Sequence, residues 1–368
     1  MWRIRAYINR FWPLISGMKE LLTEWRKFLK EEKTKLIKEI SASNMKDAGF
    51  SIGELLKKQI NNAVKKHKTE DLIKEFPEWL EKAKKLTKKE APSTYEFIDG
   101  MADGADIDFD VAFGTWYEEL NYAKNKEKVK DEGCTDIIVI NNKTVMIGHT
   151  NDETPGDGSK LIKLSIKDKP VIYGCFTRGV PSIGLNEDGL VISGNQIDAN
   201  DTKPGIPRMV LYFEALFSKN MKEAQNILLN SKRASSFNNI LADESGEVVS
   251  LEASSEEEKK TNHSDGIDAH TNHFISLKNK EGRKGDNLER SMKRLERALT
   301  DAKEKGNKMS VEDMKEIMKS HGEGGLCRHV EDEKDTATVF SIIFLPRERK
   351  LVYGDGNPCK TKYVEVEY

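Results

Sequence analysis

The stretch VKDEGCTDIIVI puts a cysteine, Cys134, directly after a glycine and at the first residue of an apolar run typical of a buried strand. Cysteine is a small apolar residue when it is buried and a strong nucleophile when its thiol is activated. The position raises the question of whether Cys134 only packs or also reacts. The answer depends on the groups that the fold brings beside it.

The residues after Cys134 predict a β-hairpin that places polar groups near the thiol. Two strand-like runs are joined by Asn141 and Asn142, and asparagine tolerates the backbone angles of a two-residue hairpin loop. In that register Cys134 faces His149 across the hairpin, and Asn151 and Asp152 lie just beyond the end of the second strand. The hairpin alone therefore predicts a thiol, an imidazole and a carboxylate in one neighbourhood.

Three interpretations of Cys134 are compatible with this neighbourhood. The residue is a buried hydrophobe beside a histidine, or it forms a papain-like pair in which His149 acts as the base. In the third interpretation the bond between Gly133 and Cys134 breaks, and the new α-amino group becomes the base for its own thiol. Such an amine has a pKa of about 8, which suits a base near neutral pH. Gly133 favours this cleavage because glycine lets the backbone bend toward the attacking thiol.

The hairpin opens a β-rich part of the chain that follows a helical part. Residues 1 to about 90 carry helical patterns rich in Lys and Glu, and the segment STYEFIDGMADGADIDFDVAFGTWYEELNYAK predicts two more helices around a glycine-containing turn. From Cys134 on, strand pairs with turns such as NEDGL and DESGE are interrupted by helical patterns. Hairpins with inserted helices predict antiparallel sheets covered by helices.

Six segments occur in an order that resembles one enzyme family. They are GCTDIIV, GHTND, GLNEDGLVISGNQI, HTNHF, NLERSMKRL and the C-terminal CRH…TATVFSIIFLPRERKLVYGDGNPC. In this order they are similar to the isopenicillin-N acyltransferase family of cysteine N-terminal-nucleophile (Ntn) hydrolases, and more distantly to the bile-salt and penicillin V hydrolases. Upstream, EFIDGMADGADIDFDVAFGTWYEEL resembles the family's helical pro-segment, so the resemblance covers about residues 45 to 368.

The resemblance implies an α+β fold, a four-layer αββα Ntn-hydrolase sandwich with a helical N-terminal pro-segment. Residues 1–44 are then an extra N-terminal helical segment, residues 45–133 are the pro-segment, and residues 134–368 are the catalytic domain. The implied activity is autoproteolysis, followed by cleavage of a linear amide C–N bond through a thioester on Cys134. Two alternatives stay open: an acyltransferase that moves an acyl group from a CoA thioester or an amide to an amine, and an uncleaved, inactive binding protein.

The resemblance also implies roles for particular residues. Cys134 is the nucleophile and the new N-terminus, and Asp152 in GHTND holds its α-amino group. Asn195 in SGNQ and Asn272 in HTNHF match asparagines of the family's oxyanion hole or substrate site. Side-chain amides aimed at a developing oxyanion contribute roughly 3–4 kcal/mol each in comparable sites.

An arginine completes the implied site. Arg290 in NLERSMKR matches the arginine of the family's Ser-x-x-Arg motif, with Asn287 in place of the usual serine. The bile-salt hydrolases also have an arginine between the cysteine and the aspartate, and here the residues around Thr150 take that place. Activation of Cys134 is therefore expected to follow the acyltransferase pattern.

The remaining histidines and cysteines predict no metal centre. His321, Cys327 and His329 resemble part of a zinc cluster, but no fourth ligand is evident, and protein zinc sites usually have four. Cys175 and Cys359 are interpreted as ordinary buried or surface thiols. We therefore expect neither a metal nor an organic cofactor.

Composition limits the partners. The net charge of the 368 residues is -2, with acidic residues interspersed among the lysines, which excludes a nucleic-acid binder. No apolar run reaches the ~18 residues of a membrane span, and the start lacks the apolar region of a signal peptide. The basic, aromatic start leaves a membrane-surface anchor open beside a plain amphipathic helix. Four scattered cysteines predict a reduced, cytoplasmic protein. The expected partners are a small amide or acyl substrate and the retained pro-segment; the oligomeric state stays open.

Overall fold

The computed structural model describes residues 36–124, 133–153, 159–330 and 336–368. The chain divides into two units, residues 1–38 and 39–368, and the fold below is that of the second. Strand β1 (Ile37–Ala42) begins at their boundary. The expected helical character of residues 1–44 is therefore wrong at residues 37–42. Their side chains alternate between more and less exposed positions, which is the period of a strand.

Seven helices follow β1 in the part of the chain before Cys134 that the structure describes. They are α2 (Met45–Leu55), α3 (Lys57–Lys66), α4 (Thr69–Glu75), α5 (Pro77–Glu90), α6 (Pro92–Ala105), α7 (Phe109–Trp116) and α8 (Glu119–Lys124). Asn44 caps α2 by accepting a hydrogen bond from the Asp47 amide. Pro77 and Pro92 each open a helix, where the missing amide hydrogen of proline costs nothing. Pro77 thus marks the boundary between α4 and α5.

Helices α2 and α6 approach each other through glycines on both sides of the contact. A Cβ atom on Gly49 would lie 1.9 Å from the carbonyl oxygen of Phe97, and one on Gly100 would lie 1.9 Å from that of Lys46. Such distances are impossible for real atoms, so the two backbones can touch only because these side chains are absent. The glycines on this face of the two helices are therefore packing residues.

The remaining strands form two antiparallel sheets. The eight-stranded sheet has the order β1-β4-β5-β6-β7-β8-β9-β10, and the six-stranded sheet has the order β11-β2-β3-β12-β13-β14. The bounds in the first sheet are β4 (Ser159–Ile166), β5 (Ile172–Thr177), β6 (Val180–Asn186), β7 (Val191–Gln196), β8 (Phe237–Ala242), β9 (Val248–Ala253) and β10 (Glu258–His263). Those in the second are β2 (Gly133–Ile140), β3 (Val145–Glu153), β11 (Gly266–His270), β12 (Ala337–Leu345), β13 (Lys350–Asp355) and β14 (Val364–Glu367).

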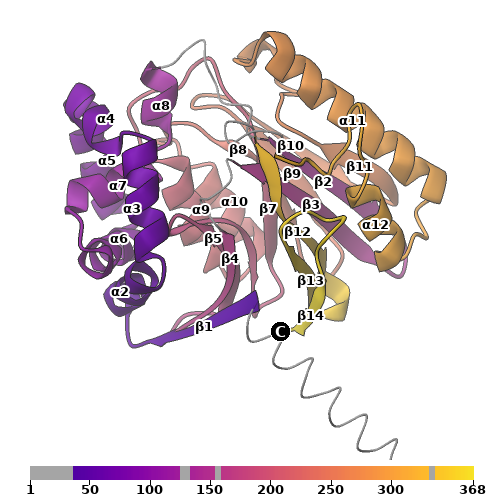
Figure 1. Ribbon diagram of the computed structural model, residues 1–368, viewed down its shortest axis with the longest axis horizontal. Helices are drawn as coiled ribbons and strands as arrows, with labels where there is room; N and C mark the ends of the chain where they lie inside the picture. The colour runs from indigo at the N-terminus through magenta and orange to yellow at the C-terminus, as the bar shows by residue number, and fades with distance from the viewer. Residues whose placement is uncertain (1–35, 125–132, 154–158, 331–335) are drawn as a thin grey trace, which may run out of the picture. The chain divides into compact units, whose positions relative to one another are not determined.

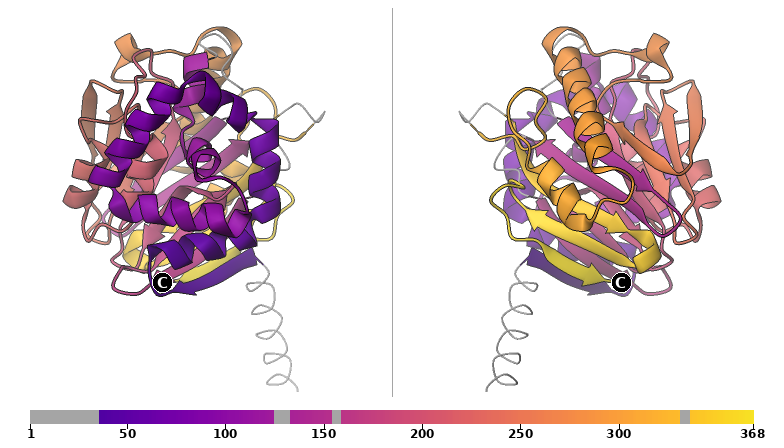
Figure 2. Two further views of the ribbon diagram at one scale, coloured as in Figure 1. Left: turned by 90° about the vertical axis from the view of Figure 1, so that its left-hand side faces the viewer. Right: turned by 90° about the vertical axis from the view of Figure 1, so that its right-hand side faces the viewer.

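Helices cover the outer face of each sheet, which gives four layers (Figure 1, Figure 2). Helices α9 (Arg208–Leu216) and α10 (Met221–Leu228) pack with α2–α8 against the eight-stranded sheet, in one large apolar core. Helices α11 (Gly285–Lys305) and α12 (Val311–Met318) pack on the six-stranded sheet in a second core. The short turns η1 (Lys278–Lys280) and η2 (Pro346–Glu348) complete the described elements. The αββα sandwich expected from the sequence is confirmed.

The pairing of β2 with β3 differs from the predicted register by two residues. Ile140 pairs with Val145, so the loop has four residues instead of two, and Cys134 lies opposite Asn151 rather than His149. The loop is longer because the side-chain oxygen of Asn141 accepts hydrogen bonds from the amides of both Lys143 and Thr144.

Among the described residues, no helix has both the length and the apolar character that crossing a membrane requires.

Substituting alanine for Gly100 should separate α2 from α6, because the new methyl group would collide with the carbonyl oxygen of Lys46. We expect the free energy of unfolding to fall by at least about 1–3 kcal/mol, the usual cost of overpacking. Urea denaturation of Gly100→Ala measures this. Glu54→Ala, at an exposed position of α2, is the matched control and should change little. Equal stability of Gly100→Ala and wild type would contradict the close backbone contact.

Candidate active site

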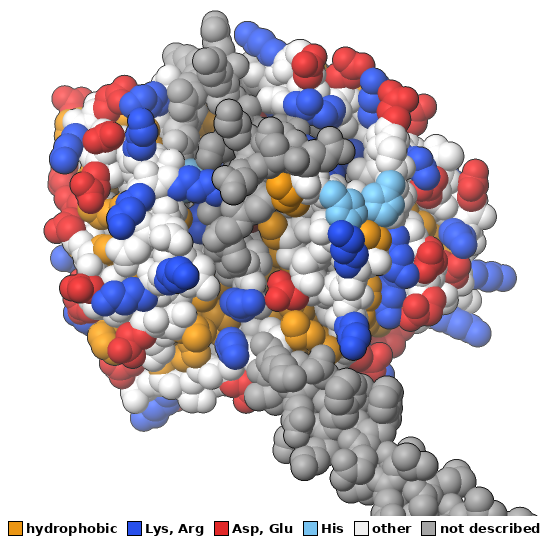
Figure 3. Space-filling view, in the orientation of Figure 1, with side chains coloured by type: hydrophobic (Ala, Val, Ile, Leu, Met, Phe, Trp, Pro, Cys, Tyr) orange, Lys and Arg blue, Asp and Glu red, His pale blue; other side chains and the backbone are white. Residues whose placement is uncertain are grey.

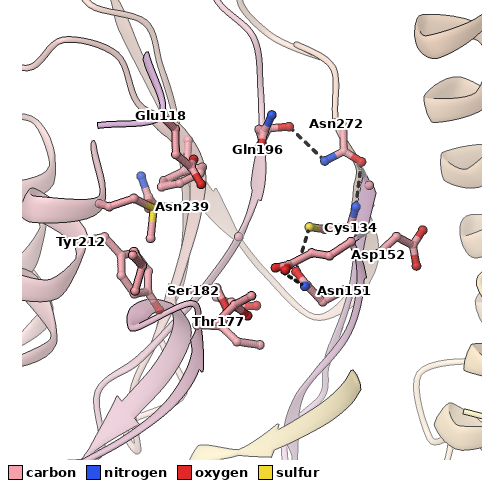
Figure 4. Close-up of a pocket in the computed structure, with 18 of the residues that line it drawn as sticks. Glu118, Cys134, Asn151, Asp152, Thr177, Ser182, Gln196, Tyr212, Asn239 and Asn272 are labelled. Carbon is pink, nitrogen blue, oxygen red and sulfur yellow. Dashed lines mark hydrogen bonds between the residues drawn. The ribbon is translucent and has the colours of Figure 1, made fainter. Parts of the chain in front are cut away.

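Cys134 is the second residue of β2 and lines a pocket between the two sheets (Figure 4). Asn151 and Asn272 lie beside it, whereas Gln196 and Tyr212 come from the eight-stranded sheet and α9. The thiol-bearing residue is half-buried, and the pocket mixes polar and apolar walls. A cysteine at this place can meet a small molecule, which a purely structural core cysteine could not.

Side chains hold both hydrogen-bonding groups of the Cys134 backbone. Its amide donates to the Oδ1 atom of Asn272 at 2.8 Å, and its carbonyl oxygen accepts from the Nη1 atom of Arg294 at 2.8 Å. The Nη2 atom of Arg294 also donates to Asn272 Oδ1 at 2.7 Å. The Asn272 amide nitrogen donates in turn to the carbonyl oxygen of Gln196 at 3.0 Å, which ties the first residues of β2 to the facing sheet. The start of β2 is therefore fixed by a closed polar network.

Arg294 explains why a glycine precedes the cysteine. A Cβ atom on residue 133 would lie 2.8 Å from Arg294 Nη2, and the guanidinium cannot move away without losing its bonds to Cys134 and Asn272. Burial lowers the pKa of Arg294, while nearby Asp152 opposes that effect. An arginine stays charged in proteins even so. Gly133 therefore provides room for a buried cation, and its φ angle is not positive.

The thiol of Cys134 faces the space between the sheets. Its Sγ atom lies 3.3 Å from Asn151 Oδ1 and donates a hydrogen bond to it. The Nδ2 atom of Asn151 donates to Glu153 at 2.8 Å, which fixes the orientation of the amide. Asn151 thus lies opposite Cys134, at the position where the predicted register placed His149.

His149 belongs to a buried polar group on the same side of the sheet as the thiol. It pairs with Asp136, which is the next residue pair along the hairpin on that side. Its Nδ1 atom lies 3.1 Å from Asp136 Oδ1, and the hydroxyl of Ser193 in β7 donates to the same oxygen at 2.5 Å. Burial alone would lower the pKa of His149, but the Asp136 carboxylate, with a smaller contribution from Cys134, raises it to about 10. Near neutral pH His149 is therefore an imidazolium paired with the Asp136 carboxylate.

Asp152 lies on the opposite side of the hairpin from the thiol. It is the cross-strand neighbour of Gly133, the residue on the far side of the expected cleavage. Its carboxylate accepts a hydrogen bond from the hydroxyl of Thr338 at 2.7 Å and lies 3.8 Å from the guanidinium of Arg328. Figure 4 shows the Asp152 side chain directed away from the pocket and the Asn151 side chain directed toward Cys134.

The structure brings Cys134, Asp152 and Asn272 together but separates two other expected site residues from them. Asn195 does not line the pocket; its Oδ1 atom accepts from His270 at 3.1 Å in the layer between the sheets. Arg290 is exposed on α11 and donates to Asn287 at 2.6 Å. In this structure the arginine at Cys134 is Arg294, and the placement of Arg290 there is wrong by one helical turn.

The sequence contains a signal for Arg294. Ser291 and Arg294 have the Ser-x-x-Arg spacing without any substitution, whereas Asn287 and Arg290 need one. The hydroxyl of Ser291 accepts a hydrogen bond from the Asn272 amide at 2.8 Å. The motif therefore works as a unit: its serine orients the HTNHF loop and its arginine reaches the backbone of Cys134. Asn151 could have been found only with the correct hairpin register.

The αββα sandwich, with Cys134 near the start of an inner strand and its thiol in a pocket between the sheets, has the arrangement that the family resemblance implies. The model of the acyl-coenzyme A:6-aminopenicillanic acid acyl-transferase family matches residues 139–360. The chain belongs to this family, and it is an amide-acting enzyme of the Ntn type.

Solved structures with a similar fold include bacterial hydrolases. A mutant of the conjugated bile acid hydrolase from Clostridium perfringens is 10% identical, with a TM-score of 0.40 over 64% of this chain and 97% of its own. A second variant of that enzyme is 12% identical, also with a TM-score of 0.40 over 64% of this chain and 97% of its own. The penicillin V acylase from Agrobacterium tumefaciens is 11% identical, with a TM-score of 0.39 over 64% of this chain and 86% of its own.

Replacing Arg294 should impair the site, whereas replacing Arg290 should not. Arg294→Gln removes the charged hydrogen bonds to the Cys134 carbonyl and to Asn272, and such bonds contribute about 1.5–3 kcal/mol each. We expect amide turnover to fall by about 10- to 100-fold. Arg290→Gln, one turn away on the same helix, should stay within about twofold of wild type, since surface changes are usually small. Equal losses in the two variants would contradict the assignment.

Stability should depend on pH through His149. Its pKa in the folded protein is about 10, above the ordinary value of 6.5. The ion pair with Asp136 therefore stabilises fully below about pH 6.5, and this contribution disappears as the pH rises through about 10. Chemical denaturation of Cys134→Ala and of Cys134→Ala/His149→Gln checks this without interference from cleavage. The difference in unfolding free energy between the two should shrink from about pH 6 to about pH 10; a constant difference would show that His149 is neutral.

Proposed function

We propose that the chain is an autoproteolytic cysteine amidohydrolase that cleaves linear amide C–N bonds through a thioester on Cys134. The observation that supports this best is the fixed backbone of Cys134. Asn272 holds the amide nitrogen, Arg294 holds the carbonyl oxygen, and the thiol is free to point into a pocket. Each of these groups is one that an N-terminal cysteine nucleophile requires in place.

Maturation consists of two balanced steps. The Sγ atom of Cys134 attacks the carbonyl carbon of Gly133, the C–N bond breaks, and the leaving nitrogen takes up the proton that the thiol gives up. The product is a thioester between Gly133 and Cys134, with a free α-amino group on Cys134. Water then hydrolyses the thioester and releases the Gly133 carboxylate and the thiol. Asn272 already accepts a hydrogen bond from this nitrogen before cleavage, so the new amine is held where it forms.

Turnover repeats this chemistry on an external amide. The α-amino group takes the thiol proton and passes it to the departing amine of the substrate, while the acyl group stays on Cys134. Asp152 lies beside Gly133 across the hairpin. Its carboxylate would therefore lie near the new N-terminus once the bond between Gly133 and Cys134 is cut. The Oδ1 atom of Asn272 supports a role in holding the amine. The oxyanion role that the sequence suggested for Asn272 and Asn195 has less support, because the amide nitrogen of Asn272 donates to Gln196 and Asn195 does not line the pocket.

The segment before the cleavage site stays attached in this proposal. Phe97 and Trp116 are fully buried against Phe213 of α9, and Glu118 lines the pocket. The carboxylate of Glu118 pairs with the buried Arg208 at 2.8 Å. Separating the two fragments would expose this aromatic cluster to water and leave the Arg208 cation without its partner. The free-energy cost of these changes is far larger than the free energy gained by releasing the cut segment. The helical segment therefore becomes a permanent small subunit and a wall of the substrate site.

Water is the acyl acceptor that the pocket favours. Among the described residues that line it, Arg178 is the one cation, and it already contacts His67 at 2.9 Å and Glu118 at 3.5 Å. An acyl-CoA donor needs several cations for its phosphates. Acyl transfer to an amine remains the second candidate, because the family is described as an acyl-transferase.

Competition between the two acceptors separates these candidates. An amide substrate is supplied with a competing primary amine, and free acid is measured against transferred product. We expect free acid to dominate and to form equally well without the amine. Product that forms only with the amine, or only from an acyl-CoA, would make the protein an acyltransferase.

Cleavage at Gly133–Cys134 is the direct test of the proposal. The purified wild-type chain should yield two fragments on a denaturing gel, and N-terminal sequencing of the larger should read Cys-Thr-Asp. Cys134→Ala should remain one chain, because no thiol can attack Gly133. Cys175→Ala, at a buried thiol outside the pocket, is the control and should still be cleaved. A wild-type chain that stays intact while hydrolysing amides would refute the autoproteolytic mechanism, and one that is both intact and inactive would favour the binding protein.

A further inference from the structure

Four side chains of the metal-binding type converge outside the pocket. Three come from the segment after α12 and the fourth comes from the turn after β13: His321, Cys327, His329 and Cys359. One ligand atom from each residue lies within 4.8 Å of all the others. The expectation of an incomplete cluster is therefore wrong, because Cys359, 30 positions beyond His329 in the sequence, folds back beside it.

The distances within the cluster match a tetrahedral metal site. The Nε2 atom of His329 lies 3.0 Å from His321 Nε2, 3.2 Å from Cys359 Sγ and 3.7 Å from Cys327 Sγ. Ligands of a tetrahedral zinc ion, at about 2.0–2.1 Å for nitrogen and 2.3 Å for sulfur, are separated from one another by about 3.3–3.8 Å. The three distances from His329 Nε2 are close to this range, and all four atoms lie within 4.8 Å of one another, so side-chain shifts of about an ångström would bring them to bonding distance of one zinc ion.

The geometry points to a structural zinc site of the Cys₂His₂ type, and we propose that the protein binds one zinc ion there. Two thiolates and two imidazoles are the donor set that zinc prefers, and a set of four protein ligands leaves no open position for catalysis. The two thiolates also cancel the charge of the ion, which is needed because Arg328 and Lys360 are adjacent in sequence to the ligands. Histidine side chains gather on the face drawn in Figure 3 beside lysine or arginine side chains.

Hydrogen bonds of the surrounding backbone hold the ligands in place. The amide of Cys327 donates to the carbonyl oxygen of Ser320 at 2.9 Å, which closes the loop between the first two ligands. The side chain of Asn357 donates to the carbonyl oxygens of Arg328 and Thr338, at 2.5 and 3.2 Å, and so attaches the turn that carries Cys359. The ligands sit on segments that are already packed together, and a metal ion would lock these segments at their surface end.

The loop that carries the zinc ligands also contacts Asp152, the cross-strand neighbour of Gly133. Arg328 lies between two of the ligands in the sequence, and its guanidinium is 3.8 Å from the carboxylate of Asp152. Thr338 donates to the same carboxylate and accepts a hydrogen bond from the Arg328 amide at 2.9 Å. The metal-bound loop therefore fixes two of the contacts that position Asp152. Zinc has no part in the chemical steps proposed above, and its presence does not depend on them.

Metal analysis of the purified full-length chain tests the proposal. The protein is prepared without an affinity tag or chelator, and its zinc content is measured by plasma mass spectrometry. We expect about one zinc per chain in the wild type and in Cys134→Ala, and less than about a tenth of that in Cys327→Ser/Cys359→Ser. Cys175→Ala is the matched control for loss of a thiol outside the cluster and should keep its zinc.

Cobalt replacement keeps the proposal testable if the double variant does not fold. Wild type refilled with Co²⁺ should show the visible bands of tetrahedral cobalt together with an ultraviolet thiolate-to-cobalt band. Three results would overturn the proposal: a wild-type chain without zinc, a double variant that retains it, or a disulfide between Cys327 and Cys359 in the wild type, seen by mass spectrometry of the unreduced protein.

Discussion

The guanidinium of Arg294 is the constraint around which the site is arranged. Arg294 is a buried residue of α11. Its guanidinium donates to the carbonyl oxygen of Cys134 and, together with the Cys134 amide, to the side-chain oxygen of Asn272. A buried cation requires hydrogen-bond acceptors, and here they are the carbonyl oxygen of Cys134, the side-chain oxygen of Asn272 and the hydroxyl of Thr135 at 3.1 Å. The same cation requires a glycine at position 133. The Gly-Cys step is thus a consequence of packing at the helix–sheet boundary.

Successive side chains of a β-strand point to opposite faces, so the polar groups around Cys134 are divided between the two sides of one hairpin. On the side facing the other sheet lie the thiol, Asn151 and the ion pair of His149 with Asp136. On the side facing the helices lie Arg294, which donates to the carbonyl oxygen of Cys134, and Asp152, the cross-strand neighbour of Gly133. In the proposed mechanism the thiol and the amine of Cys134 would therefore have separate environments: the pocket for the thiol and a charged, buried setting for the amine. A cysteine inside an uncut chain, which needs a second residue as its base, could not achieve this arrangement alone.

The sequence predicted the layers of the fold and grouped Cys134 with the loop that contains Asn272, because these depend on local periodicity and on contiguous motifs. Its failures were in contacts between segments. The hairpin register shifted by two residues because the Asn141 side chain, rather than the backbone alone, closes the turn. The choice between Arg290 and Arg294 depends on which face of α11 meets the sheet, and only packing decides that.

Long-range contacts explain the other differences. Cys359 joins the His321 cluster through the position of β13, which nothing near Cys359 in the sequence reveals. Strand β10 has the composition of a solvated loop, with EKKTNH mostly exposed, and is a strand only because β9 pairs with it along its whole length. β1 lies at the other edge of the same sheet, within a lysine-rich region. Edge strands of this kind have weak patterns because only one side of each is paired.

The central claim is that the thiol and the free amino group of one residue, Cys134, carry the reaction. Trapping the acyl-enzyme tests it most directly: wild type is mixed with an amide substrate, quenched in acid within a turnover, and digested for mass spectrometry. The account predicts the acyl mass on a peptide that begins with Cys134, bound as a hydroxylamine-sensitive thioester, with the α-amino group of that cysteine unmodified. An acyl group on another residue, or on Cys134 within an uncleaved chain, would contradict it.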